Sequence, residues 1–270
     1  MKNIENIREI MRKLRDPENG CPWNLEQTFK SIVPHTIEEA YEVADCIEQE
    51  DFASLLVELG DLLFQVVFYT QLASEQKLFD FEDVVAALAR KLTERHPHVF
   101  DDLPPGDHDD QDRRWEAHKA HERAIANTGR AVSELDGVPA GLPALSRANK
   151  LQKRAARVGF DWPNSDEVRS KVMEEFQELE VAVKADSKLQ IEEEMGDLLF
   201  ACVNWARHLG LEPESTLRLA TRKFEWRFNF IERSLIDAGT NVVEASLGTM
   251  DRLWEAAKIA ERQEAAEREK

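Results

Sequence analysis

The strongest constraint on the fold is a pair of amphipathic helical patterns that occurs twice in the chain. Over residues 171–208, two apolar stripes with helical spacing are separated by a short polar turn near residues 185–188. The first stripe is Val172, Phe176, Leu179 and Val183, and the second is Met195, Leu198, Leu199, Cys202 and Leu209. The pattern also runs over residues 36–69, with matching positions offset by 136 (175 − 39). Because so short a turn makes helices antiparallel neighbours, the sequence predicts two copies of one helical hairpin.

Each predicted hairpin carries four carboxylates at matched positions. They are Glu175, Glu178, Glu194 and Asp197 in the later copy, and Glu39, Glu42, Glu58 and Asp61 in the earlier one. Within each helix the two acids are three residues apart, so they project from one flank on adjacent turns. Converging carboxylates raise one another's pKa unless a cation neutralises them. A hard divalent cation such as Mg²⁺ takes oxygen ligands of this kind, so the pattern predicts a metal site.

The alternative for one E-x-x-E pair is an ordinary solvated helix flank, because glutamate is a good helix former. Two features favour the metal site. Gly196 lies within a strong helical pattern at a cost of about 1 kcal/mol relative to Ala, which predicts a reason in packing or in the site. The same spacing, including Gly60, is also kept in both copies.

The fold class that follows is all-α, with two tandem helical-bundle domains that arose from an internal duplication. No strand pattern of any length is present in the sequence. We expect an N-terminal domain over 1–126, a linker over 127–143 that is rich in Gly and Pro, and a C-terminal catalytic domain over 144–270. The earlier hairpin is expected to begin at Thr36, with Glu39 completing a capping box.

Composition limits the partners and the compartment. The net charge is −18 and the pI is about 4.9, which disfavours nucleic acid and anionic membrane surfaces. Three widely spaced cysteines argue against a disulfide framework and for a reducing cytoplasm. The N-terminus lacks the pattern of a signal peptide, and the apolar run Leu62–Tyr69 is too short to span a bilayer. We expect a soluble cytoplasmic protein.

Three cations are candidates for binding an anionic substrate. Lys171 lies four residues before Glu175, and Lys223 and Arg227 share one helix face. Together they suit a polyphosphate, since Arg offers a fork of donors and Lys a point charge. An isolated pair of this kind is more often solvated. Trp254 could stack on a nucleobase, although a lone helical Trp is more often part of a core.

Longer motifs resemble the MazG family of nucleoside triphosphate pyrophosphohydrolases. In the second half these are E-E-x-x-E, then E-x-x-D within EEEMGDLLF, with LPALSRANKLQKRAARVGFDW before and KFEWRF after. In the first half they are LRDPENGCPW, ELGDLLFQVVFY and RHPHVF. The resemblance covers nearly the whole chain except the acidic loop over 101–112 and the C-terminal tail.

The resemblance implies an all-α, Mg²⁺-dependent enzyme, usually a homodimer, that hydrolyses NTPs and dNTPs to the monophosphate and pyrophosphate. Its roles would be control of nucleotide pools or modulation of the stringent response. By this analogy the metal ligands are Glu175, Glu178, Glu194 and Asp197. The nucleotide site would comprise Lys171, Glu174, Gln190, Ile191, Glu192, Glu193, Asp197, Lys223, Arg227 and Trp254. Glu174, next to the ligands, is our candidate for orienting the attacking water.

Two other classes of protein are disfavoured by missing motifs. A di-iron carboxylate protein needs Glu-x-x-His pairs, and a P-loop NTPase needs G-x-x-x-x-G-K-[ST]. A non-catalytic dimerisation or nucleotide-binding module stays open as the alternative. If the protein is an enzyme, we expect the second copy to do the chemistry, because the first copy has His35, preceded by Pro34, where the second has Lys171.

Overall fold

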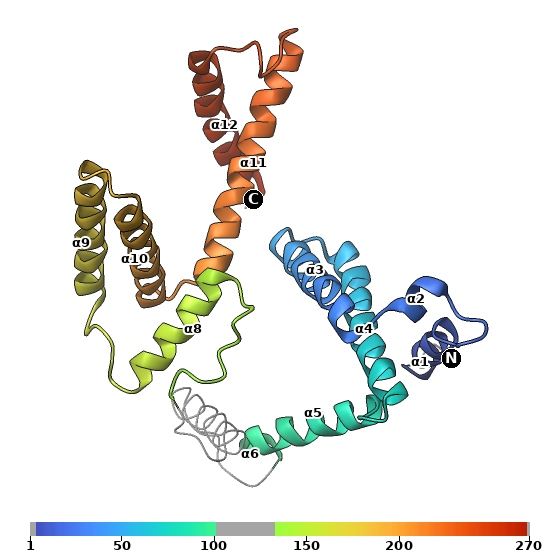
Figure 1. Ribbon diagram of the computed structural model, residues 1–270. Coiled ribbons are helices and arrows are strands. Elements are labelled where there is room, and N and C mark those ends of the chain that lie inside the picture. Colours follow the sequence, from blue (N-terminus) through green and yellow to red (C-terminus); the bar gives the residue numbers. More distant parts are fainter. Residues whose placement is uncertain (1–3, 101–132, 269–270) are drawn as a thin grey trace. The chain divides into compact units, whose positions relative to one another are not determined.

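The computed structural model describes residues 4–100 and 133–268, and all the secondary structure in these ranges is α-helical (Figure 1). The all-α prediction is therefore confirmed. The chain divides into two compact units, residues 1–121 and 122–270. The expected boundary at residue 126 lies outside the described residues, so the domain limits stay a prediction.

The first unit contains six described helices. They are α1 (Ile4–Leu14), α2 (Pro22–Glu26), α3 (Phe29–Glu48), α4 (Phe52–Glu75), α5 (Phe81–Arg95) and α6 (Pro97–Phe100). The antiparallel pair α3–α4 is the first copy of the predicted hairpin (Figure 1).

The predicted start of α3 at Thr36 was wrong. The helix begins at Phe29, soon after α2 ends at Glu26, and its N-cap is Thr28, which forms a capping box with Ser31. The hydroxyl of Thr36 instead donates to the carbonyl oxygen of Ile32 at 3.2 Å, inside the helix. In this capping box a serine stands where a Glu is usual, whereas Thr36 with Glu39 matches the usual sequence pattern. The usual pattern therefore predicted the wrong start of the helix.

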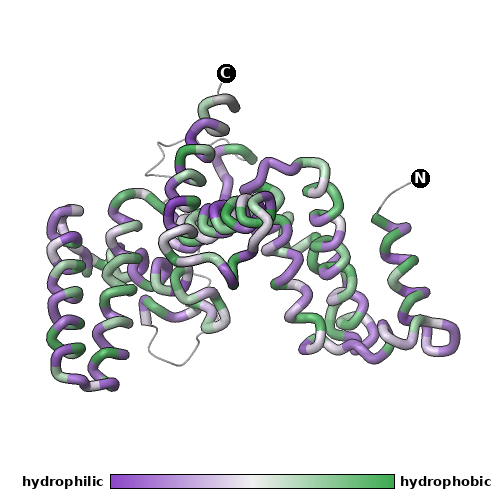
Figure 2. The backbone as a smooth tube through the Cα atoms, turned by 90° about the horizontal axis from the view of Figure 1, so that it is seen from above, coloured by the Kyte–Doolittle hydropathy of each residue, from purple (hydrophilic) through white to green (hydrophobic). Residues whose placement is uncertain are grey.

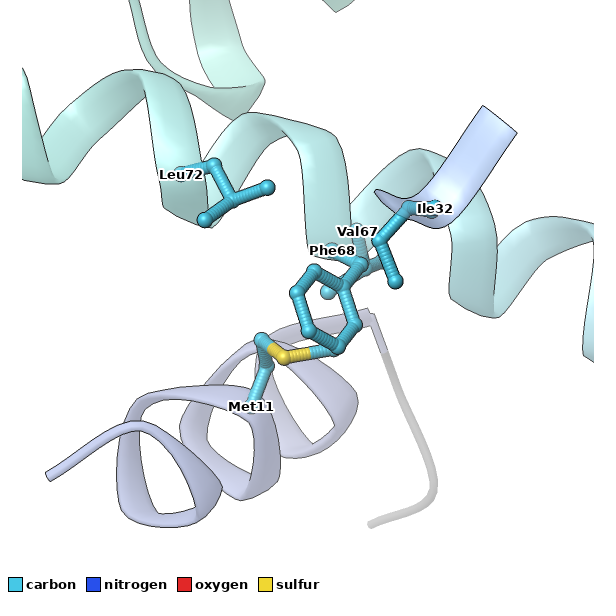
Figure 3. Packing of buried hydrophobic residues seen from close by; sticks show 5 residues of the cluster. All are labelled: Met11, Ile32, Val67, Phe68 and Leu72. Carbon is cyan, nitrogen blue, oxygen red and sulfur yellow. The ribbon is translucent and has the colours of Figure 1, made fainter. Parts of the chain in front are cut away.

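The core of the first unit lies between α1, α3 and α4. It consists of Met11, Ile32, Val67, Phe68 and Leu72, all nearly free of solvent contact (Figure 3). The guanidinium of Arg15 lies 5.5 Å from the centre of the Phe68 ring, and its Nη2 is 2.6 Å from Oε2 of Glu75. The residue after α1 thus joins that helix to α4 through both a ring contact and an ion pair.

Among the described helices, α4 is long and apolar enough to cross a membrane, by length and composition only. The argument that the run Leu62–Tyr69 is too short was wrong for the helix as a whole, which has 24 residues. One such helix is weak evidence, because core helices pass the same test. Here α4 supplies Phe68 to the core and carries Glu58 and Asp61, and carboxylates are costly within a bilayer.

The second unit begins, in the described part, with residues 133–143 and continues through five helices. They are α8 (Ala144–Arg157), α9 (Ser165–Lys184), α10 (Lys188–His208), α11 (Pro213–Asp237) and α12 (Leu247–Arg268). The α9–α10 pair confirms the predicted hairpin and its turn. α8 packs against α10 and α11, and α12 packs against α11. Arg154 donates to the carbonyl oxygens of Glu134 and Asp136, which joins the middle of the expected linker to α8.

The apolar stripes of this hairpin are only partly covered. Leu179 is buried on α9, whereas Phe176 and Val183 are about half exposed. On α10, Ala201 and Val203 are buried, while Met195, Leu199 and Cys202 remain exposed, as does Leu209 directly after the helix. Figure 2 shows hydrophobic and hydrophilic residues alternating along the helices of both units. Most residues of the two stripes are therefore not covered by the other helix of the hairpin.

Candidate metal and substrate site

The α9–α10 hairpin brings three of the four predicted metal ligands together. Glu175 comes from α9, and Glu194 and Asp197 come from α10. One carboxylate oxygen from each lies within 4.8 Å of the others, and Glu175 is only 6% exposed. Glu178 lies outside this group, although its charge acts on Glu194. Three carboxylates converging from two helices match the donor set of a hard divalent cation.

The electrostatics of the cluster show a local excess of negative charge. The pKa of Glu194 is raised, first by burial and then by the charges of Glu178 and Glu175. Each of these effects disfavours the ionised carboxylate. A bound cation would reverse them, so the cluster has an electrostatic reason to take one.

Lys171 is the cation closest to these ligands. It lies one turn before Glu175 on α9, with Nζ 2.7 Å from Oε1 of Glu175 and 2.8 Å from Oε1 of Glu174. The hydrogen bonds that Lys171 donates to Glu174 and Glu175 raise the pKa of Lys171. The ammonium is therefore charged and held beside the cluster. Glu174, the candidate for orienting water, is exposed and bound to this lysine, outside the group of three carboxylates.

The other predicted nucleotide-binding residues form two further sets. Gln190, Glu192 and Glu193 are exposed at the start of α10, with Ile191 half-buried among them, directly before Glu194.

The second set lies on α11 and α12. Arg227 donates from Nε and Nη2 to Oε2 of Glu261, at 2.8 and 2.6 Å, and its guanidinium lies 5.3 Å from the centre of the Trp254 ring. Lys223 is exposed on the same helix. Within the described residues, Arg227 forms its ion pair with Glu261 rather than with the carboxylates of the α9–α10 hairpin.

A pocket of about 670 Å³ adjoins the carboxylates, and the sequence reasoning missed it. We call it the α8–α10 pocket. Its lining includes Lys171, Glu175 and Asp197, together with Leu151, Gln152, Phe160, Trp162, Ala201, Asn204 and Arg207. Its volume falls in the range of about 300–1,000 Å³ that is typical of small-molecule sites. The segment RAARVGFDW carried the only sequence signal, as part of a longer motif without an assigned role.

An ion-pair network fixes the loop between α8 and α9. Arg207 donates from Nη1 to Oδ2 of Asp161 at 3.0 Å and also binds Oδ1, while Nε2 of His208 lies 3.0 Å from Oδ1. The hydrogen bonds from Arg207 are the main cause that lowers the pKa of Asp161 to about 2. The network therefore holds the loop that carries Phe160 and Trp162 against the end of α10.

We expect this network to make stability depend on pH in the acid range. The pKa of Asp161 is lowered from 3.8 to about 2, so its stabilising effect is fully present above pH 3.8 and is lost as the pH falls toward 2. Because the loop is partly exposed, the contribution is on the order of 1 kcal/mol. Urea titrations of the wild type and Asp161→Asn should differ at pH 6 and converge near pH 2. A constant difference over this range would contradict the assignment.

The first copy of the site lacks the lysine. Glu39, Glu42 and Glu58 offer oxygens within 4.8 Å of one another, and the pKa of Glu39 is raised by burial, by Asp61 and by Glu42. His35 contacts Glu38, at 3.6 Å. The polar neighbour of Glu39 is instead an amide, because Nε2 of Gln65 lies 3.4 Å from its Oε1.

The two mid-helix glycines lack the packing reason that was expected. A Cβ atom built on Gly60 or Gly196 would meet no atom within 4 Å in the described chain. Of the two predicted reasons, packing within the described chain is not found, and a reason in the site stays a prediction. Both glycines lie on an open face of their hairpin, and each directly precedes one of the predicted ligands, Asp61 or Asp197.

Comparison of the sequence with known proteins identifies the family of this chain. The model of the MazG nucleotide pyrophosphohydrolase domain matches residues 27–100 and 164–230. The nucleoside triphosphate pyrophosphohydrolase of Escherichia coli K12 is 50% identical over 263 residues, which are 97% of this chain and 99% of that protein. The chain belongs to the MazG family.

Other MazG relatives extend the comparison. A nucleoside triphosphate pyrophosphohydrolase/pyrophosphatase MazG from Thermotoga maritima is 42% identical over 255 residues, 94% of this chain and 95% of that protein. A solved structure of a mazG-related protein from the same organism aligns with a TM-score of 0.37 and 24% identity, covering 43% of this chain and 99% of that one. Each of the two matched MazG segments contains its own set of four acids. Gln152, Phe160 and Trp162 lie outside both segments.

Proposed function

We propose that the chain is a Mg²⁺-dependent nucleoside triphosphate pyrophosphohydrolase that converts NTPs and dNTPs to the monophosphate and pyrophosphate. The observation that carries the proposal is the convergence of Glu175, Glu194 and Asp197 with Lys171 at the wall of a ligand-sized pocket. Membership of the MazG family supports it, since relatives that match nearly end to end are named for this reaction.

The residues have distinct roles in this proposal. Glu175, Glu194 and Asp197, with Glu178 nearby, would hold the metal, which when bound polarises phosphate oxygens and acidifies water. Lys171 neutralises negative charge on the polyphosphate, because its ammonium is held beside the ligands. The carboxylate of Glu174 accepts a hydrogen bond from Lys171, and its role in this proposal is to orient the attacking water.

The second copy is the one proposed to do the chemistry. It has both the lysine and the pocket, whereas in the first copy an amide from Gln65 contacts Glu39. Lys223, Arg227 and Trp254 would contribute from α11 and α12 to a nucleotide bound at a complete site. The first copy keeps its three converging acids, so binding of a metal there is compatible with the proposal.

The test is to identify the products. Incubation with ATP and Mg²⁺ should yield AMP and pyrophosphate in equal amounts, separated by ion-exchange chromatography. Removal of the metal with EDTA should abolish the reaction, and added Mg²⁺ should restore it, because the three acids need a cation to bind a polyphosphate. ADP and orthophosphate as products would contradict the proposal. Nucleotide binding without any products would favour the alternative, a non-catalytic nucleotide-binding module.

We also propose a homodimer, in which a second copy covers the apolar faces that one chain leaves exposed. These include Phe176, Val183, Met195 and Leu199 on the α9–α10 hairpin, and Leu56, Val57 and Leu63 on α4. Such a density of exposed large apolar side chains on paired helices is unusual for a monomer. Two-fold symmetry is the commonest way to cover one face with its own copy.

Light scattering should therefore give a mass of twice 31.0 kDa. Replacing Leu199 and Met195 together by Glu should shift the protein toward monomer. In a two-fold interface the new carboxylates would face those of the second copy, so they would repel one another and would have to be removed from water. The exposed Val243, in the turn before α12, offers a control for Val→Glu substitution that should leave the mass unchanged. A wild-type mass of 31 kDa would overturn the dimer.

The proposed setting is the bacterial cytoplasm, with nucleoside triphosphates as substrates and neither nucleic acid nor membrane as partner. The net charge of −18 repels both anionic partners, and Cys21, Cys46 and Cys202 are all free thiols. Control of nucleotide pools or modulation of the stringent response would be the role of such an activity.

A further inference from the structure

The carboxylates of the two hairpins converge in different combinations. In the second unit the group contains one predicted ligand of α9 and both of α10, namely Glu175, Glu194 and Asp197. In the first unit it contains both of the matching acids on α3 and one on α4, namely Glu39, Glu42 and Glu58. Burial, and then the charges of neighbouring acids that include Asp61, raise the pKa of Glu39 and of Glu58. The first unit therefore has an acidic cluster with its own geometry and its own excess of negative charge.

Gln65 continues the acidic face of α4. Glu58, Asp61 and Gln65 follow one another at spacings of three and four residues, so they share one face of the helix. This face is turned toward α3, because Nε2 of Gln65 lies 3.4 Å from Oε1 of Glu39. With the offset of 136 residues, α10 has Ala201 at this position (201 − 65). An amide thus stands at the end of the first cluster, where the second unit has only a methyl group.

The amide oxygen of Gln65 is buried without a partner. The residue is 5% exposed, and its Oε1 accepts no hydrogen bond in the part of the chain that the structure describes. Because the carboxylate of Glu39 can only accept, Nε2 is the amide atom that faces it. A half-turn of the terminal amide would instead place Oε1 beside the carboxylates. That arrangement is repulsive by itself and becomes favourable when a cation lies between the oxygens.

The next turn of α4 is filled as well. Phe68 is 0% exposed and packs on Met11 of α1 (Figure 3), whereas Asn204, in the same register of α10 (204 − 68), borders the α8–α10 pocket. Side chains of the first unit therefore occupy the register at which the second unit leaves space for a ligand. An ion bound by the first cluster would keep protein oxygens as ligands on this side, rather than those of a substrate.

We propose that the first unit holds a divalent cation between α3 and α4, with Oε1 of Gln65 as a ligand beside the three converging carboxylates, and that this ion stabilises the hairpin without taking part in hydrolysis. Carboxylate and amide oxygens together form the donor set of a hard cation. The inference goes beyond the proposed function, because it concerns the unit to which no chemistry is assigned. Its tests measure metal binding and stability, so they apply whether or not the protein hydrolyses nucleotides.

The first experiment counts the ions bound by the first unit. The full-length protein with Glu175→Gln and Glu194→Gln, which lacks two acids of the second cluster, is titrated with Mn²⁺ alone, and free Mn²⁺ is measured by electron paramagnetic resonance. We expect one Mn²⁺ per chain, and adding Gln65→Leu should weaken its binding at least about 10-fold, as loss of groups around a metal does. The absence of bound Mn²⁺, or an equal Kd with and without Gln65→Leu, would overturn the inference.

Thermal unfolding separates a metal ligand from an amide with a purely structural role. Without metal, Gln65→Leu should unfold at the same Tm as its parent or higher, because it removes a buried oxygen without a partner and keeps an apolar side chain there. Mn²⁺ should raise the Tm of the parent more than that of the variant, since only the native state binds the ion. A difference in Tm that is the same with and without Mn²⁺ would contradict the proposal.

A second amide on the same helix provides the matched control. Gln71, further along α4, donates from Nε2 to Oε1 of Glu75 at 3.0 Å, so Gln71→Leu should leave the affinity for Mn²⁺ unchanged. If Gln65→Leu does not fold, Gln65→Glu keeps the size and an oxygen ligand. It should bind Mn²⁺ at least as tightly as its parent, because the carboxylate adds a negative charge. Weaker binding by this variant would overturn the inference.

Activity measurements distinguish this ion from the one in the proposed function. In the otherwise wild-type chain, Gln65→Leu should leave pyrophosphate release from ATP unchanged while it weakens the binding of Mn²⁺ by the first unit. A loss of activity as large as that of Glu175→Gln would overturn the non-catalytic role of the ion. A protein that binds Mn²⁺ through Gln65 but releases no pyrophosphate would contradict the proposed function and leave this inference standing.

Discussion

Glu175→Gln is expected to reduce pyrophosphate release from ATP by at least about 100-fold, whereas Glu39→Gln should change it less than about threefold. Loss of partners that only support metal ligands already costs about 10–100-fold, and Glu175 is proposed as a ligand itself. Its side chain is buried, and the substitution removes one negative charge while keeping the size. The rate should be measured at limiting Mg²⁺, where a lost ligand has the largest effect.

The matched pair separates the two copies of the site. Glu39 occupies the same register in α3 as Glu175 in α9, and both belong to groups of three converging carboxylates. General damage from removing a helical glutamate should therefore affect both variants alike. If Glu39→Gln lost activity while Glu175→Gln kept it, the first unit would be the catalytic one. Circular dichroism of both variants would show whether the helices persist.

Phe68→Ala should lower the free energy of unfolding of the first unit by about 3–5 kcal/mol, the usual range for a fully buried Phe. Its ring is 0% exposed, packs edge-on against Phe64 at 5.8 Å between centroids, and lies under the guanidinium of Arg15. Truncation leaves a cavity that the surrounding helices fill only in part. Urea denaturation combined with hydrogen exchange of α4 amides would assign the loss to this unit.

The residue in the same register of the second unit provides the control. Asn204→Ala should cost about 1 kcal/mol or less, because Asn204 borders a pocket rather than filling a core and loses only its bonds to Arg207. Similar losses for the two variants would show that the α8–α10 pocket is filled in solution. That result would also remove the structural contrast between the two units.

The helical hairpins could be predicted because their signals are local. Apolar spacing, a polar turn and acids three residues apart all act within one or two helical turns. The start of α3 could not be read correctly, because two capping patterns compete there. Thr28 with Ser31 prevails over Thr36 with Glu39, and the chain before α3 is shaped by α2 and by Arg15 binding to the carbonyl of Asn24.

The site was predictable to the same extent. The spacing placed Glu175, Glu194 and Asp197 together, because a hairpin converts two local pairs into one cluster. The α8–α10 pocket was not predictable in this way. It depends on how α8 and the loop with Asp161 pack against α10, and that packing follows from long-range contacts between residues about 46 positions apart (207 − 161). The distance between Arg227 and the carboxylates likewise depends on tertiary structure.

The pairing of Lys171 with Glu174 and Glu175 lies entirely within one helix, and this limits how much of the molecule must move when a substrate arrives. If the ammonium turns from these carboxylates toward a phosphate, it rotates about its own side-chain bonds and breaks no contact between helices. Rotamer changes of this kind take picoseconds to nanoseconds, whereas rearrangement of packed helices takes microseconds or longer. The exchange of counter-ions is therefore too fast to limit turnover at this site.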